Sequence, residues 1–207
     1  MGLAININLN PQFPIDLFNN SYKIDYFTTL IKSVILISAF LVMLCSLNYV
    51  KQNDILKIEY PILILSSILG MLVMVSSNDL IVFYVGLELQ SLALYVLAAF
   101  KRDNILSSES GLKYFILSAL SSGLLLYGCS LIYGFSSSTN FDLIYQNSES
   151  IEYGIIFGIV FVLVGLAFKI TAVPFHMWAP DVYDGSPTSV TVIFAILPKI
   201  AALTVFI

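Results

Sequence analysis

Four ionisable side chains lie inside stretches of the sequence that otherwise consist mainly of apolar residues. They are Glu88 in VFYVGLELQSLAL, Lys113 in GLKYFILSAL, Lys169 in GLAFKITAVPFH and Lys199 in FAILPKIAAL. A charged side chain at the centre of a bilayer costs from ~2.5 to more than ~10 kcal/mol, so such residues usually mark an ion pathway. We therefore predict that these four residues form an ion path through a membrane.

Glu88 and Lys113 each have a second interpretation. Glu88 lies near the middle of its apolar stretch, where burial can also keep a structural carboxyl protonated. Lys113 lies about one turn inside its predicted helix, where the side chain can instead extend to the membrane surface. If the two residues meet across adjacent helices, each favours the charged form of the other. We predict Glu88, which would exchange partners with Lys113, as the gate of the path, and Lys169 as its central proton carrier.

Two of the lysines lie close to a proline. Lys169 precedes Pro174 by five residues, and Lys199 directly follows Pro198. Proline removes a backbone donor, and an opened helix is tolerated in a membrane where it lines a cavity or is buried in protein. We expect a broken helix at Pro174 and a local opening at Pro198. A fixed ion pair is the alternative for Lys169.

His176 is the single histidine of the chain and lies beside the predicted break. Imidazole exchanges protons near neutral pH, so His176 is a candidate proton relay. The alternative is a structural residue that only makes hydrogen bonds.

The composition excludes several classes of protein. The 207 residues are 58% hydrophobic and only 11% charged, whereas soluble domains carry about 25% charged residues. The chain is therefore a polytopic membrane protein. One histidine and two separated cysteines do not form a metal site or an iron–sulfur site. Lysine and arginine are scattered, so nucleic acid is not an expected partner.

The apolar stretches predict an all-α membrane protein with about six transmembrane helices, since a span needs about 20 residues. The fifth helix is interrupted by proline, and the turn-rich stretch WAPDVYDGSPT follows it. Asp184 or Ser186 is expected to cap the sixth helix. The predicted helices cover roughly residues 26–50, 61–77, 79–100, 110–135, 153–174 and 187–207.

The loops predict the orientation and the domain organisation. Alternating helices place Lys51, Lys57, Lys101 and Arg102 on one side, which the positive-inside rule assigns to the cytoplasm or matrix. Residues 1–25 form a predicted N-terminal surface segment, and residues 26–207 form one transmembrane domain.

The motifs GLELQ, LKYF, AFKITAVPFHMWAPDVYDGSPT and PKIA occur in this order. They resemble the chain 2 (subunit N) family of respiratory complex I, the proton-pumping NADH:ubiquinone oxidoreductase. This resemblance implies an antiporter-like fold of two inverted repeats, each with a broken helix. It also implies that Glu88, Lys113, Lys169 and Lys199 form a charged row at mid-membrane that transfers protons.

The chain differs from complete members of that family. They have further helices before the first helix here, and a second inverted repeat after the last one. We therefore expect one antiporter-like repeat plus a preceding helix. The chain is either a fragment or one piece of a split subunit, with a second polypeptide as the partner that supplies the missing repeat.

The leading prediction is a proton-translocating membrane subunit of mitochondrial NADH:ubiquinone oxidoreductase. Frequent Ile, Phe, Tyr, Asn and Ser fit an AT-rich mitochondrial genome, which places the chain in the mitochondrial inner membrane. The expected partners are other complex I membrane subunits and lipids. Flavin, iron–sulfur clusters and ubiquinone are expected on partner subunits, and no cofactor on this chain. Two alternatives stay open: an assembly scaffold that does not pump, and a stand-alone cation/proton antiporter.

Overall fold

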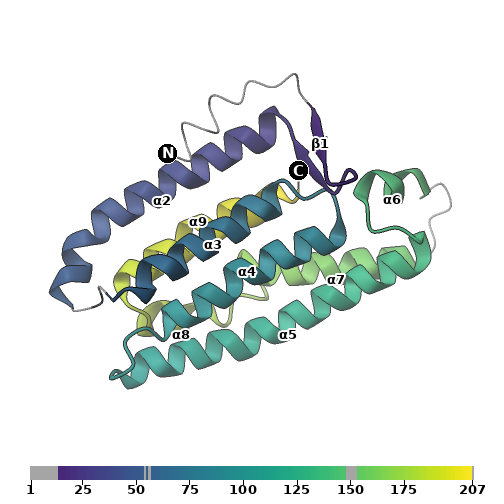
Figure 1. Cartoon of the computed structure of the whole chain (residues 1–207). Helices are drawn as coiled ribbons and strands as arrows, with labels where there is room; N and C mark the ends of the chain where they lie inside the picture. Colours follow the sequence, from purple (N-terminus) through teal and green to yellow (C-terminus); the bar gives the residue numbers. More distant parts are fainter. Residues whose placement is uncertain (1–13, 54, 56, 148–152, 207) are drawn as a thin grey trace.

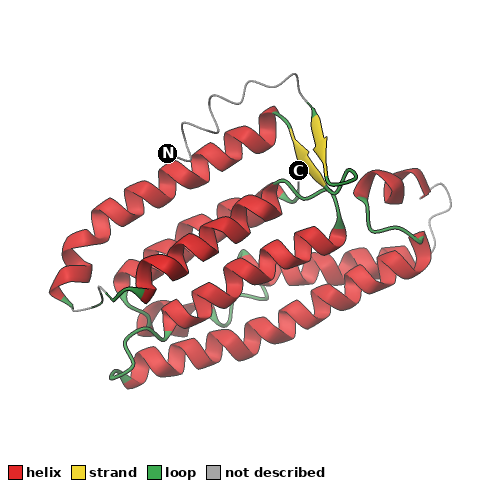
Figure 2. Cartoon of the chain, in the orientation of Figure 1, coloured by secondary structure: helices red, strands yellow, loops and turns green. Residues whose placement is uncertain are grey.

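The computed structural model describes residues 14–53, 55, 57–147 and 153–206 (Figure 1). This part of the chain is mostly helical, with one short two-stranded sheet (Figure 2). The elements are β1 (Ile15–Leu17), β2 (Tyr22–Ile24), α2 (Tyr26–Gln52), α3 (Glu59–Val75), α4 (Leu80–Ala98), α5 (Ile105–Ser136), α6 (Phe141–Asn147), α7 (Tyr153–Lys169), α8 (Ala179–Gly185) and α9 (Thr188–Thr204).

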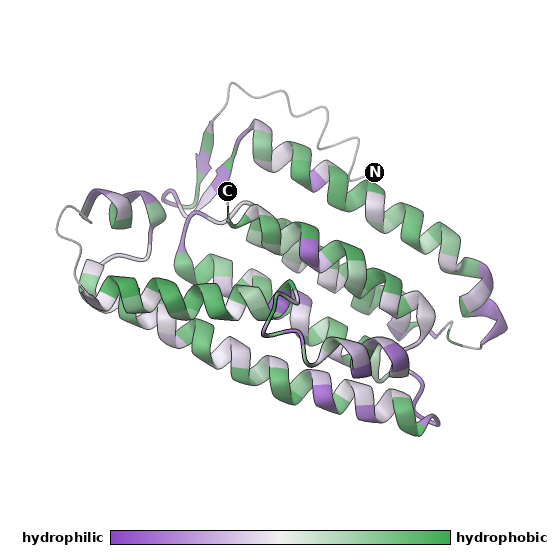
Figure 3. Ribbon diagram, turned by 180° about the vertical axis from the view of Figure 1, so that it is seen from behind, coloured by the Kyte–Doolittle hydropathy of each residue, from purple (hydrophilic) through white to green (hydrophobic). Residues whose placement is uncertain are grey.

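Six of the described helices are strongly apolar. Helices α2, α4 and α5 are long and apolar enough to cross a membrane, and α3, α7 and α9 are shorter apolar helices of 17 residues. At 1.5 Å per residue, a helix of 17 residues is about 26 Å long, close to the ~30 Å of a hydrocarbon core. Figure 3 shows apolar residues along these helices, and polar residues concentrated near their ends. The predicted multi-pass helical membrane protein is confirmed.

Polar side chains set where several of these helices begin. The carboxylate of Asp25 accepts from the backbone N–H of Thr28 in a capping box at the start of α2. Asp79 accepts from the backbone N–H groups of Ile81 and Val82, and Asn104 starts α5 in the same way. A side-chain oxygen at this position satisfies backbone donors that the helix itself leaves free. Asp79 is therefore the N-cap residue of α4.

The helices lie side by side, and glycines allow the closest pair to pack tightly. Helix α3 packs along α4, and α5 packs along α7 (Figure 1). A Cβ atom added to Gly70 of α3 would lie 2.5 Å from the backbone N of Gln90 and 2.7 Å from the carbonyl O of Gly86. Both contacts are far inside van der Waals distance, so only glycine fits at Gly70. This close approach fixes α4, which carries Glu88, Ser91 and Tyr95 of the site described below.

Three connecting segments differ from the sequence prediction. Within the predicted surface segment 1–25, residues 15–24 form a hairpin, while residues 1–13 lie outside the described part of the chain. The polar stretch after α5 contains α6, and the stretch predicted as a loop after the break contains α8. Neither Asp184 nor Ser186 caps the last helix: α9 starts after Pro187, without a side-chain cap among the described residues.

The hairpin is fixed to two helix connections by a network of polar contacts. Asn78, between α3 and α4, donates through Nδ2 to Asp142 Oδ2 (2.8 Å) and to the carbonyl of Asn20 (3.0 Å). Asn20 itself donates to Asp142 Oδ2 (3.1 Å), and Asn140 donates to the carbonyl of Asn20 (2.8 Å). Phe18, Asn19 and Asn20 have positive φ angles, which form the tight turn of the hairpin. The network therefore joins the hairpin, the α3–α4 turn and the start of α6.

Replacing Gly70 with alanine is expected to destabilise the protein by about 1–3 kcal/mol, because the new methyl group forces α3 and α4 apart. Thermal unfolding in detergent measures the effect. Gly123→Ala is the matched control, since an added Cβ there has no atom within 4 Å. If the two variants unfold at the same temperature, Gly70 does not set the spacing of α3 and α4.

The polar network also predicts a pH dependence of stability. The hydrogen bond from Asn78 lowers the pKa of Asp142; burial opposes this shift, while Asn20 and Lys23 add to it. A carboxyl with a lowered pKa contributes stability above its unfolded pKa, and this contribution is lost as the pH falls through the folded pKa. Asp142→Asn should therefore lower the unfolding temperature near neutral pH.

The difference between the wild type and Asp142→Asn should shrink as the pH falls below about 4, near the pKa of an unfolded aspartate. Unfolding temperatures of both proteins across this range test the expectation. A difference that stays constant down to the lowest pH would show that the charge of Asp142 does not stabilise the network.

Candidate functional site

Helix α7 ends at Lys169, and the chain leaves regular helical structure until α8 begins at Ala179. Thr171 has a φ of +60°, which turns the backbone away from the helix axis. The indole Nε1 of Trp178 donates to the carbonyl of Phe168 (3.1 Å) and so satisfies one of the carbonyls at the end of α7. A break is present as predicted, but α7 ends five residues before Pro174, so Lys169 is the last helical residue before the break.

Three hydroxyl groups from two other helices surround the ammonium group of Lys169. Its Nζ donates to Ser91 Oγ (3.0 Å) and Tyr95 OH (3.2 Å) of α4, and to Ser118 Oγ (2.7 Å) of α5. The Lys169 side chain is buried. A buried charge without hydrogen bonds would cost several kcal/mol or more, so these contacts account for the lysine at this position.

The hydroxyl groups also contact one another and the backbone. Tyr95 OH donates to Ser118 Oγ (2.6 Å), and Ser91 Oγ donates to the carbonyl of Leu87 (2.7 Å). Each hydroxyl can accept from an ammonium group or donate to a neutral amine. The cluster can therefore hold Lys169 in both protonation states, which a fixed carboxylate partner would not do equally well.

Aromatic rings close the cluster on one side. The ring of Tyr95 lies edge-on to Tyr114, with centroids 4.9 Å apart, and Tyr114 stacks on Trp178 at 4.6 Å. Phe168 also stacks on Trp178, at 5.5 Å. These packed rings link the segment after the break to α4 and α5. They also exclude bulk water from the cluster on that side.

Glu88 lies on the same face of α4 as Ser91 and Tyr95, because residues three and seven positions apart share a helix face. Its Oε1 atom is buried and has no hydrogen-bond partner among the described protein groups. The Glu88 carboxylate and the Lys169 ammonium interact electrostatically, but they form no direct ion pair in the described part of the chain. The fixed ion pair considered for Lys169 is therefore absent here.

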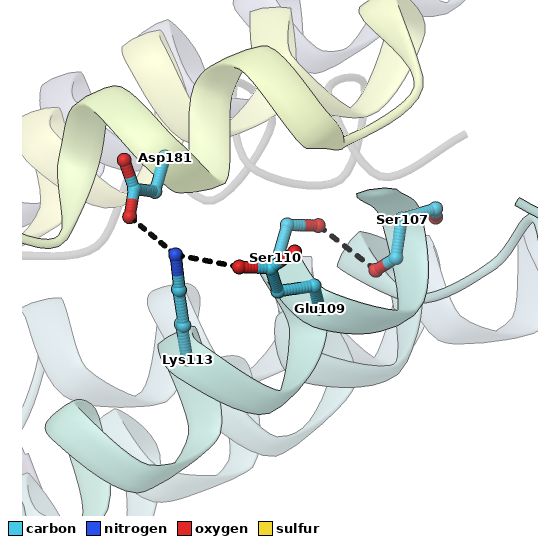
Figure 4. Close-up of polar contacts among 5 residues, drawn as sticks. All are labelled: Ser107, Glu109, Ser110, Lys113 and Asp181. Atoms are coloured by element: carbon cyan, nitrogen blue, oxygen red, sulfur yellow. Dashed lines mark hydrogen bonds and ion pairs between the residues drawn. The ribbon is translucent and has the colours of Figure 1, made fainter. Parts of the chain in front are cut away.

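Lys113 contacts other partners than the predicted Glu88. Its Nζ lies 2.8 Å from Glu109 Oε1 on the same helix and 2.6 Å from Asp181 Oδ2 on α8 (Figure 4). The Lys113 side chain is 41% exposed. The alternative of extension toward the surface thus describes Lys113 better than a buried pair with Glu88. The ion pair with Asp181 connects α5 to the segment that follows the helix break.

Lys199 and His176 lie outside the hydroxyl cluster. Helix α9 continues through Pro198, so the local helix opening predicted beside Lys199 is wrong. The surrounding helix packing holds this proline in place. The Nζ of Lys199 lies 5.6 Å from the ring centroid of Tyr183, as in a cation–π contact. His176 lies in the break and is exposed.

Tyr95 and Ser118 are site residues that the sequence prediction missed. Tyr95 lies seven positions after Glu88, with Ser91 between them, so one helix face carries all three. This spacing is a signal that could have identified Tyr95. Ser118 has no comparable signal, because α5 contains many serines and only the packing of α5 against α4 and α7 selects this one.

The family model described as NADH:quinone oxidoreductase/Mrp antiporter, TM, matches residues 77–207, which is more than half of the chain. The matched region contains the whole hydroxyl cluster and the broken helix. The chain therefore belongs to this family of antiporter-like transmembrane proteins.

Individual proteins show where within the family the similarity lies. The chain is 67% identical over 193 residues to NADH-quinone oxidoreductase subunit N of Pelagibacter ubique, an alignment that covers 93% of this chain and 41% of that protein. It is 52% identical to the same subunit of Rhodospirillum rubrum, covering 100% of this chain and 43% of the relative. The chain thus spans about two fifths of the curated relatives that it matches.

A solved structure shows the same fold. A chain of respiratory complex I from Thermus thermophilus with bound aureothin superposes with a TM-score of 0.82 and 30% identity, covering 99% of this chain and 44% of that one. The antiporter-like arrangement of helices therefore agrees with a complex I membrane chain.

Replacing Lys169 with methionine is expected to leave the unfolding temperature unchanged or raise it. Methionine has a similar length, and the lost hydrogen bonds of the ammonium group are offset because its charge no longer has to be buried. Thermal unfolding in detergent, with Gly70→Ala as the destabilised reference, tests this. If Lys169→Met unfolds at a temperature as low as that of Gly70→Ala, Lys169 has a structural role instead.

Proposed function

We propose that this chain is a proton-translocating part of subunit N of a membrane-bound NADH-quinone oxidoreductase. The observation that carries the proposal is a buried lysine beside a helix break, held only by neutral hydroxyl groups. A lysine with a carboxylate partner is held in its charged form. Lys169 has no such direct partner among the described residues, so its proton can be exchanged.

Glu88 is the proposed group that controls this exchange. Its negative charge favours the protonated form of Lys169, and its loss favours release of the proton. The unpartnered Oε1 of Glu88 supports a role for water, because a buried carboxylate oxygen needs a hydrogen-bond partner. Water between Glu88 and the hydroxyl cluster would complete a path for proton transfer.

Lys113, Lys199 and His176 are proposed to extend the path at either side of Lys169. Lys113 would change the position of α8 when its ion pair with Asp181 breaks, since that contact joins α5 to the segment after the break. Lys199 lies on α9. We propose that its charge responds to the protonation state of Lys169 and in turn affects the next antiporter-like unit of the complex. Exposed His176 is proposed to exchange protons with water in the break.

The wider setting of the chain is also a proposal. Residues 26–207 would form one antiporter-like repeat with a preceding helix, and residues 1–25 a surface segment. Other membrane subunits of the complex would be partners, and flavin, iron–sulfur clusters and quinone would lie on other subunits. The reported relatives come from bacteria, so they favour a bacterial membrane and give no support to the mitochondrial one.

Two alternative functions are a scaffold role and a stand-alone antiporter. A scaffold role would leave proton pumping to other subunits, and a stand-alone antiporter would be purified without redox subunits. The antiporter alternative has support in the family, whose description includes Mrp antiporters. Purification from native membranes separates these cases, because a subunit of the oxidoreductase is isolated together with flavin and iron–sulfur proteins.

Lys169→Met in the assembled oxidoreductase is expected to lower the number of protons translocated per NADH oxidised, because the central proton carrier is lost. Proton uptake and NADH oxidation are measured together in sealed vesicles. Lys51→Met is the control, since Lys51 is an exposed lysine at the end of α2. An unchanged ratio in a fully assembled complex would favour the scaffold role.

A further inference from the structure

A large groove opens between α3, α4 and α5 on the outer surface of the chain. Its volume is about 770 Å³. Most of its wall is apolar, and several of its residues are about half exposed in the described structure. The apolar wall includes Ile62, Leu63, Val96, Leu112 and Phe115.

The mouth of the groove is charged. Lys57 and Arg102 line it, and Glu59 is the acidic residue that shares this lining. A neighbouring polar pocket also contains Lys57 and Arg102, together with Lys101 and Asp103. The three cations thus outnumber the two carboxylates at this end of the bundle, and the exposed side chains of Lys57 and Arg102 are free to move toward a ligand.

The start of α3 adds to the positive potential at the same place. Ile58 is the N-cap residue of this helix, and its side chain cannot accept a hydrogen bond. The dipole of α3 favours an anion at this end of the helix, where Glu59 in the first turn already supplies one negative charge. Lys57 and Arg102 also lie on the side that the positive-inside rule assigns to the cytoplasm, where anionic lipids can interact with them.

We propose that this groove binds an anionic glycerophospholipid. The phosphate would lie between Lys57 and Arg102 near the start of α3, and one acyl chain would lie against Val96, Leu112 and Phe115. A lipid fits both parts of the site, because its charged head and apolar tail match a cationic mouth and an apolar wall. Basic pockets between transmembrane helices bind anionic headgroups in this way.

The inner end of the groove reaches Tyr95, whose hydroxyl accepts a hydrogen bond from Lys169. An acyl chain in the groove would therefore cover the outer side of Tyr95 and exclude water from it. The proposed lipid site is independent of the proposed proton translocation, because it is inferred only from the shape and charge of the groove.

Photo-crosslinking in the assembled complex tests the proposal. The complex is reconstituted into phosphatidylcholine vesicles with a small fraction of phosphatidylglycerol that carries a photoreactive group in its acyl chain. Peptide mass spectrometry then locates the crosslinks. We expect labelling of residues 95–115, and a weaker signal from a phosphatidylcholine probe with the same photoreactive chain.

Removing the charges should remove the preference for the anionic lipid. Surface electrostatic attraction contributes about 1 kcal/mol per Lys or Arg, so Lys57→Gln and Arg102→Gln should each lower the preference about fivefold. Lys51→Gln is the matched control, because it removes a cation on the same side that does not line the groove. Val96→Trp should lower labelling by both probes, since the indole fills the groove.

Three results would overturn the proposal. Equal labelling by both probes in the wild type would show that the site does not select anionic lipid. If the Lys57→Gln/Arg102→Gln double variant is labelled as strongly as the wild type, these two cations do not bind the lipid phosphate. No labelling of residues 95–115 in the wild type, with loss of assembly in Val96→Trp, would assign the groove to a protein partner.

Discussion

The hydrogen bonding of one buried ammonium group is the constraint on which the candidate site depends. The Lys169 side chain is buried away from bulk solvent, so its charge must be stabilised by hydrogen-bonding groups around it. Ser91, Tyr95 and Ser118 provide this stabilisation. Because they are neutral and can also donate, they do not fix the lysine in one charge state. In the proposed function, the same arrangement stabilises the buried lysine and leaves its proton exchangeable.

The fold brings these groups together through a few specific features. Helix α7 ends at Lys169, and the carbonyl of Phe168 next to it is satisfied by Trp178. Close glycine packing fixes the position of α4, and the contact between α5 and α7 brings Ser118 to the lysine. A helix break in a membrane requires such compensation, since free backbone groups in hydrocarbon are costly. The break thus places Lys169 beside the cluster, and Trp178 binds a carbonyl at the end of α7.

The sequence predicted the apolar helices, the break and the identity of the buried lysine. The lysine could be identified because burying a charge is costly, so a charged residue within an apolar stretch indicates a special role. It did not predict the partners correctly. Lys113 pairs with Glu109 and Asp181, since α8 packs against the start of α5, a contact between distant segments. Pro198 does not open α9, because tertiary packing overrides its local preference. The hairpin before α2 was missed, since its strands are only three residues long.

A density map of the assembled complex that resolves ordered water would test the central claim most directly. The account predicts that Lys169 keeps its three hydroxyl partners, with ordered water bound to Glu88 Oε1 and linked to that cluster. A direct ion pair between Lys169 and a carboxylate of any chain, or a dry apolar contact around Glu88 Oε1, would contradict it. In either case Lys169 could not exchange its proton through Glu88.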